Sequence, residues 1–188
     1  KTAGTLTTTI DGTTLELAQS LTLTSDTSLG VKTLKSNDKT LTLGSESTDL
    51  TVSDPLTLND SGEQILTKSA DLILNGLLTM SNGQFSSDNG TVTFNGGLIQ
   101  SGGEFYLDST ELVLGADVNK TGGKLQTSTS SVTIISNLTI SSNDNLSVTT
   151  INLGTKKLSL GSASSNLLIS DNLSLAEANA SLQTGSAD

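Results

Sequence analysis

The sequence predicts an all-β protein, a single right-handed parallel β-helix (β-solenoid) with three short strands in each coil of about 20 residues and about nine coils in all. The first observation behind this prediction is a pair of apolar residues with one residue between them, which recurs at a constant step along the chain: Leu72/Leu74, Val92/Phe94, Leu112/Leu114 and Val132/Ile134. Two further apolar series keep nearly the same pace between these pairs: Leu78, Leu98, Val118 and Leu138, and then Phe85, Phe105, Leu125 and, after one extra residue, Leu146.

The composition of the 188-residue chain is typical of strands and turns. Hydrophobic residues make up 33% of the chain but aromatic residues only 2%, so we expect a core of Leu, Val and Ile. Thr, Val and Ile favour strands, whereas Gly, Asn, Asp and Ser favour turns. Long helices are therefore not expected.

Strands can be followed from near the start of the chain, because the residue between the two members of each apolar pair would face water. The early strands are expected at 15–17, 21–23, 29–31, 41–43, 50–52 and 56–58. The spacing is least regular between Leu58 and Ile65, where we expect a longer loop or a slip in strand register. Three glycine pairs between later strands predict tight corners with positive φ: Gly96-Gly97, Gly102-Gly103 and Gly122-Gly123.

The sequence also contains a second repeat, which is much longer than one coil. Residues 13–71 match residues 130–188 at an offset of 117, so that Leu41 and Leu43 correspond to Leu158 and Leu160. With about 19.5 residues per coil, this repeat would hold six whole coils. The chain begins and ends inside a copy and shows no polar cap at either end, although an open stack normally needs one. We therefore expect residues 1–188 to be one continuous segment of a longer repetitive protein.

The sequence predicts no catalytic, cofactor-binding or metal-binding residue, and therefore a protein that is not an enzyme. It contains no His and no Cys, and a Ser nucleophile would have only Lys or a carboxylate as its base. Two carboxylates could still act on a sugar. The candidate surface patch is Glu104, Tyr106 and Asp108. The plain interpretation places Phe105 in the core and Tyr106 outside; the alternative is a carbohydrate-binding or carbohydrate-cleaving β-helix.

Two other ligands are possible on the sequence. The segment 59–63 is rich in oxygen and would place calcium near Asp60 and Glu63, although it lacks the spacing of an EF-hand. Outward Thr residues on comparable tracks, meaning the same outward position in successive coils, suggest a third function, an ice-binding solenoid. These residues are Thr22, Thr42, Thr79 and Thr139. The same tracks also carry Ile99, Asn119 and Ser159, and the ordinary strand preference of Thr explains the pattern.

The charge and the hydropathy pattern limit the partners. A formal net charge of −10 opposes binding to nucleic acid, because phosphates would repel the chain. No run approaches 18 apolar residues, so no membrane insertion of this segment is expected.

Leu-x-Leu strands, exemplified by residues 41–43 and 158–160, occur together with corners of Asn, Asp, Gly and Ser and with acidity without Cys. In these features the whole chain resembles the repetitive β-helical parts of large bacterial surface proteins, the passenger regions of filamentous haemagglutinin-like adhesins and autotransporters. The resemblance implies a structural or adhesive rod, stalk or filament element, extracellular or on a cell surface. Its partners would be neighbouring copies of itself, the rest of a longer chain, or extracellular polysaccharide.

Overall fold

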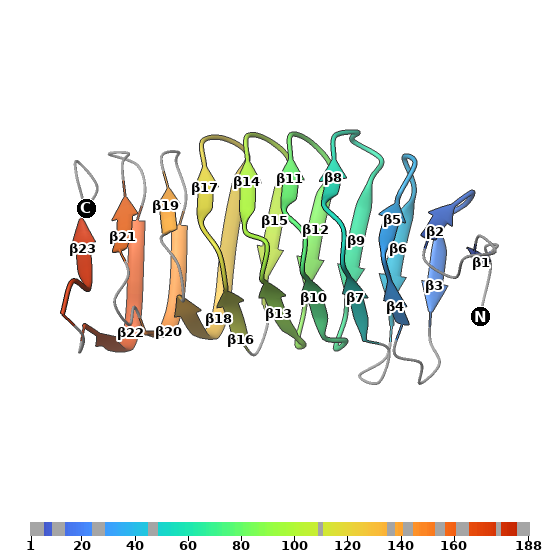
Figure 1. Ribbon diagram of the computed structural model, residues 1–188. Coiled ribbons are helices and arrows are strands. Elements are labelled where there is room, and N and C mark those ends of the chain that lie inside the picture. The colour runs from blue at the N-terminus through green and yellow to red at the C-terminus, as the bar shows by residue number, and fades with distance from the viewer. Residues whose placement is uncertain are drawn as a thin grey trace.

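The computed structural model describes residues 6–8, 14–23, 29–44, 49–108, 111–134, 138–140, 145–152, 157–160, 166–175 and 178–183. All regular secondary structure in these ranges is β-strand, which confirms the predicted all-β class (Figure 1). The strands are β1 (Leu6–Thr8), β2 (Thr14–Leu17), β3 (Leu21–Leu23), β4 (Leu29–Val31), β5 (Thr33–Lys35), β6 (Thr40–Leu43), β7 (Leu50–Val52), β8 (Leu56–Leu58), β9 (Gln64–Thr67), β10 (Leu72–Leu74), β11 (Leu78–Met80), β12 (Gln84–Ser87), β13 (Thr91–Phe94), β14 (Leu98–Gln100), β15 (Glu104–Leu107), β16 (Glu111–Leu114), β17 (Val118–Lys120), β18 (Lys124–Ile134), β19 (Leu138–Ile140), β20 (Asn145–Asn152), β21 (Lys157–Leu160), β22 (Asn166–Ser174) and β23 (Ser181–Gln183).

The strands stack in parallel as a β-solenoid of about six turns, running from the blue N-terminal end to the red C-terminal end of Figure 1. Three ladders can be followed along the stack. The β10 ladder contains β4, β7, β10, β13 and β16, and the β12 ladder contains β3, β6, β9, β12 and β15. The long strand β18 pairs with both β15 and β16 and so joins these two ladders. The β11 ladder contains β8, β11, β14, β17, β19, β21 and β23.

The predicted columns of apolar residues are confirmed by the strand register. Leu72 lies opposite Val92, Val92 opposite Leu112, and Leu112 opposite Val132. Leu72 and Val92 are fully buried and Leu112 is 5% exposed, so this file runs through the interior. The other two predicted series are also confirmed as far as Leu138 and Leu125. One step differs from the prediction, because residue 146 lies opposite residue 127 and not opposite residue 125.

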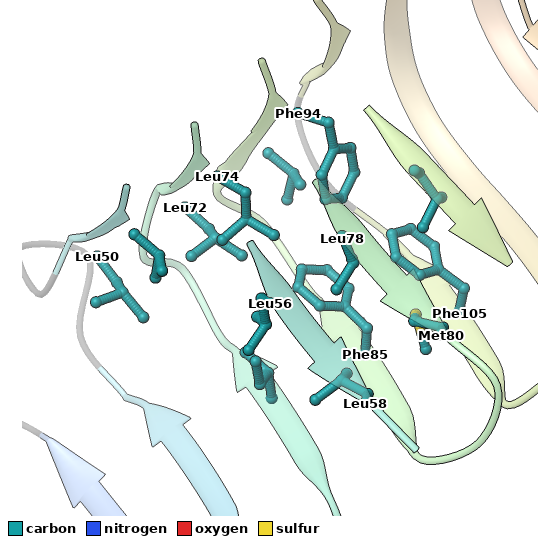
Figure 2. Packing of buried hydrophobic residues seen from close by; sticks show 14 of the residues in the cluster. Leu50, Leu56, Leu58, Leu72, Leu74, Leu78, Met80, Phe85, Phe94 and Phe105 are labelled. Atoms are coloured by element: carbon teal, nitrogen blue, oxygen red, sulfur yellow. The ribbon is translucent and has the colours of Figure 1, made fainter. Parts of the chain in front are cut away.

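Inward positions alternate with outward ones along each strand, and the inward side chains form one apolar core (Figure 2). Three phenylalanines meet in it. The rings of Phe85 and Phe105 are stacked with centroids 4.7 Å apart, and Phe94 meets Phe85 edge-on at 6.0 Å. Phe105 is buried and Tyr106 is half-buried on the outer side, as the plain interpretation of this aromatic pair predicted.

The interior column that begins with Leu58 and Met80 then becomes polar. Gln100 and Lys120 follow in register, and both side chains are fully buried. The ammonium of Lys120 donates hydrogen bonds to the carbonyl oxygens of residues 122 and 123, at 2.9 and 3.0 Å. Backbone carbonyls at a corner therefore stabilise a cation inside the stack, which is the condition for burying one.

The expected irregularity between Leu58 and Ile65 is a longer loop. Leu56 lies opposite Leu78, whereas Ile65 lies opposite Phe85, so the step from one coil to the next shortens by two residues across this segment. The loop 59–63 is thus two residues longer than the corresponding corner 81–83 of the next coil.

The glycine corners have two distinct roles. The second glycine of each predicted pair has positive φ, for example 71° at Gly103, as predicted. The first one packs against the coil before it: a Cβ on Gly96 would collide with the backbone of Gly76. Close approach of backbones, and not only the turn conformation, therefore requires glycine there.

The prediction that the 117-residue repeat holds six whole coils is wrong. In the β10 ladder, six steps from Leu29 lead to Ile151, whereas the repeat offset leads from Leu29 only to Leu146. The coils are therefore longer than the predicted average. As a result, equivalent residues of the two copies lie on different ladders: Leu41 belongs to the β12 ladder, but Leu158 belongs to the β11 ladder.

The strand β1 lies antiparallel to β2, on the side away from β5. It covers that edge of the sheet, where the sequence showed no cap. The alternation of apolar residues is the same for parallel and antiparallel pairing, so the sequence pattern carried no sign of this reversal.

Candidate functional site

The outer face of the β12 ladder carries two files of polar side chains. The first file is formed by residues that begin successive strands: Gln64, Gln84, Glu104 and Lys124. The amide of Gln64 donates a 3.2 Å hydrogen bond to the side-chain oxygen of Gln84. The second file, two residues further along each strand, is Leu66, Ser86, Tyr106 and Gln126.

Tyr106 is fixed between its two charged neighbours. Its hydroxyl donates to Oε2 of Glu104 at 3.0 Å and accepts a hydrogen bond from Nζ of Lys124 at 3.1 Å. The Lys124 ammonium also lies 4.7 Å from the centroid of the ring, within the range of a cation–π contact. The hydrogen bond to Tyr106 and the negative charge of Glu104 raise the pKa of Lys124, so it stays protonated at neutral pH.

Beside this tyrosine lies an open hollow of about 190 Å³. Its lining is Ser86, Ser87, Asp88, Tyr106, Leu107, Asp108 and Gln126. The carboxylate of Asp88 accepts a 3.0 Å hydrogen bond from Nζ of Lys68, which fixes one wall of the hollow. Two carboxylates, an amide, a hydroxyl and an aromatic ring thus face a space that is smaller than a drug-sized pocket.

Two of the three residues of the predicted surface patch therefore line the hollow. Tyr106 and Asp108 line the hollow, whereas Glu104 lies outside it and holds the tyrosine hydroxyl. Asp88 and Gln126 belong to the site and were not predicted. Asp88 lies one coil before Asp108, and Gln126 lies one coil after Tyr106. Counting one coil length back or forward from the predicted residues would therefore have identified both.

The two residues considered for calcium lie differently. Asp60 is exposed, whereas Glu63 is 5% exposed and turns into its own loop. Its Oε2 accepts hydrogen bonds from the backbone N–H groups of Asn59 and Asp60 at 2.6 and 3.0 Å. Its Oε1 accepts one from the Ser36 hydroxyl at 2.5 Å. Within the described ranges no group of three or more His, Cys, Asp or Glu residues is arranged to hold a metal ion.

The hydrogen bonds around Glu63 set its protonation. Burial alone would raise the pKa of the carboxyl group, but the hydrogen bonds from Ser36 and from backbone N–H groups, including those of Asp60 and Asn59, outweigh it and hold the pKa below the usual value. Glu63 is thus an ionised internal cap of the longer loop.

The threonines considered for ice binding do not form one ladder. Thr79 is followed in register by Ile99, Asn119, Thr139 and Ser159 in the β11 ladder. Thr22 and Thr42, in contrast, belong to the β12 ladder, where residue 66 is the next in register. The prediction of comparable tracks is wrong here because the 117-residue offset moves equivalent residues to another ladder.

Comparison of the chain with protein-family models, with curated proteins and with solved structures found no match. A search of the described residues for a helix long and apolar enough to cross a membrane found none.

Proposed function

We propose that the chain is a non-catalytic structural or adhesive rod element of a large secreted or cell-surface repeat protein. The observation that carries this proposal is the unbroken register of Leu72, Val92, Leu112 and Val132, of which the first three are buried. In such a stack each coil is covered by its neighbours, so the same unit can be added without limit. This property suits a protein that must be both long and mechanically durable.

The proposed rod is right-handed, has three strands in each coil and contains about nine coils. Right-handed crossover is the strong preference wherever one parallel strand leads to the next. At a spacing of about 4.8 Å between strands, nine coils would measure roughly 45 Å. Its partners would be the rest of a longer chain and neighbouring copies of itself.

Lengthening the chain tests the rod. Insertion of six further copies of the 20-residue coil 72–91 should add roughly 29 Å to the long dimension, at about 4.8 Å per coil, and leave the cross-section unchanged in small-angle X-ray scattering. The insertion should follow residue 91 directly, so that every later strand stays on its own ladder. A longer chain that thickens, or that forms two separate bodies, would refute the rod.

The hollow beside Tyr106 favours a second candidate, contact with an extracellular polysaccharide. One aromatic ring with carboxylate, amide and hydroxyl groups around it offers both an apolar surface and hydrogen-bonding partners to a single sugar unit. The test is a glycan-binding screen of the parent chain against Tyr106→Ala, with Thr93→Ala on another face as the control. Binding that survives Tyr106→Ala would exclude this site.

A further inference from the structure

The outer face of the β11 ladder differs from the other two faces in having almost no charge. Its central file, over β8, β11, β14 and β17, is Thr57, Thr79, Ile99 and Asn119. Ile99 is 41% exposed, which makes it one of the most exposed large apolar residues in the described part of the chain. The flanking files are also uncharged up to Asp117: on one side Pro55, Leu77 and Gly97, on the other Asn59, Ser81, Ser101 and Thr121.

Charge is instead placed on the other faces. The β12 ladder carries Lys68, Asp88, Glu104, Asp108 and Lys124 on its outer side, and the β10 ladder has acids along one margin: Asp49, Asp71 and Glu111. The chain has a formal net charge of −10, so two copies repel each other at most orientations. The β11 ladder is the face on which two copies can approach without opposing carboxylates.

Folding does not explain this distribution. Outward positions of a strand accept Lys or Glu at little cost, and charged residues on exposed sheets protect a protein from association. A flat face of Thr, Ile and Asn lacks that protection over four successive strands. We propose that this face is the contact by which the rod packs side by side on a second copy of itself. The proposal rests on the rod function above and names the partner and the surface.

Charge complementarity fixes the arrangement of the pair. Asp117 and Lys157 each precede the first inward residue of their strands, β17 and β21, and both are exposed on the same margin of the ladder. The strand β19 lies between them. A two-fold axis along β19 therefore puts Asp117 of one copy opposite Lys157 of the other, twice in each pair. The two rods would run antiparallel, face to face.

The size of the contact sets its strength. With the axis on β19, the strands β14, β17, β19, β21 and β23 of the two copies overlap, whereas β8 and β11 would be covered only in a longer rod. At about 4.8 Å between strands and roughly 17 Å along each of them, the contact covers about 400 Å². A stable complex buries about 800 Å² on each partner, so the pair should be weak for this chain and stronger for a longer rod.

Sedimentation equilibrium over a wide concentration range tests the contact. The parent chain should form a reversible dimer, and Ile99→Lys should abolish it. Ile73→Lys is the matched control, since Ile73 is 37% exposed at an outward position of the β10 ladder. The control variant should dimerise like the parent, and both variants should melt within a few degrees of it. Equal loss in the two variants would overturn the proposal.

A charge exchange tests the antiparallel arrangement. Asp117→Lys should weaken the dimer about tenfold or more, and the double variant Asp117→Lys with Lys157→Asp should restore it. Failure of the double variant to recover would overturn the two-fold arrangement. Loss of the dimer in Leu168→Lys instead would assign the contact to the end of the stack, where Leu168 is 63% exposed in β22, and would overturn the side-by-side contact. A chain that stays monomeric but lengthens on insertion of further coils would overturn the contact and leave the rod.

Discussion

The hydroxyl of Ser36 donates a 2.5 Å hydrogen bond to the carboxylate of Glu63, 27 residues further along the chain. This bond links the corner after β5 to the long loop 59–63, and the other carboxylate oxygen holds the start of that loop. Glu63→Gln keeps the volume but replaces one acceptor oxygen with a donor. We expect a loss of about 2 kcal/mol in the free energy of unfolding, since hydrogen bonds to charged groups are worth about 1.5–3 kcal/mol each.

The loss should appear as a fall of roughly 4–8 °C in Tm by differential scanning calorimetry. Glu104→Gln is the control, because Glu104 is exposed and accepts a hydrogen bond from the Tyr106 hydroxyl at the surface of the protein. Its effect should stay within about 0.5 kcal/mol, as for most surface changes. An unchanged Tm in Glu63→Gln would contradict the capping role.

The same carboxylate makes stability depend on pH. The pKa of Glu63 is lower in the folded chain than in the unfolded one, so the unfolded chain binds the proton more readily. The stability from this group is therefore fully present above the unfolded pKa of about 4.3 and is lost as the pH falls through the folded pKa. Thermal melts from pH 7 down to pH 3 should show a smaller acid destabilisation in Glu63→Gln than in the parent chain. Parallel curves for the two proteins would refute it.

The apolar part of the fold could be read from the sequence because burial imposes it. Leu72 and Val92 must both point into the core from successive coils. The inward apolar residues of every ladder can meet this condition only if they recur at the length of one coil. The polar part could not. Gln100 and Lys120 occupy inward positions where a polar residue would be assigned to the outside, and what retains them is a set of backbone carbonyls at a corner.

The candidate site shows a second limit of the sequence. Tyr106 and Asp108 were found as neighbours in the chain, but Asp88 reaches the hollow from the coil before. The same dependence on coil length explains the misplaced repeat. Six coils at the 20-residue step from Leu72 to Val92 already exceed 117 residues, and the loop 59–63 adds two more. The residue pattern gives no measure of how each corner takes up such an insertion.

Addition or removal of calcium should leave the protein unchanged. Both oxygens of Glu63 are engaged by donors of the chain itself, so a cation would have to displace hydrogen bonds that already stabilise the carboxylate. Thermal melts with about 5 mM calcium, an amount on the order of the weakest extracellular sites, and with excess chelator should coincide. A calcium-dependent rise in Tm that disappears in Asp60→Asn would show a site in this loop.

Glycine at the corner between β13 and β14 should be indispensable. A Cβ on Gly96 would meet backbone atoms of Gly76 and Leu77 in the preceding coil, which cannot move without breaking the ladder. We expect Gly96→Ala to cost about 1–3 kcal/mol, as overpacking does. Gly30→Ala is the matched control, because a Cβ at Gly30 has no neighbour within 4 Å. Urea unfolding of the two variants separates these expectations, and equal midpoints would count against the close stacking of corners.

Replacement of a single interior residue should disturb three coils. Leu112 is 5% exposed and lies between Val92 and Val132 in the same file. Leu112→Asp would bury an unpaired carboxylate, which costs several kcal/mol or forces the coil to open. Hydrogen exchange should then lose protection in β16 and also in β13 and β18, which pair with it. Thr93→Ala, at the neighbouring outward position, should leave the exchange pattern of all three strands intact. Loss confined to β16 would mean that the coils are stable one by one, which is incompatible with a core that exists only between neighbours.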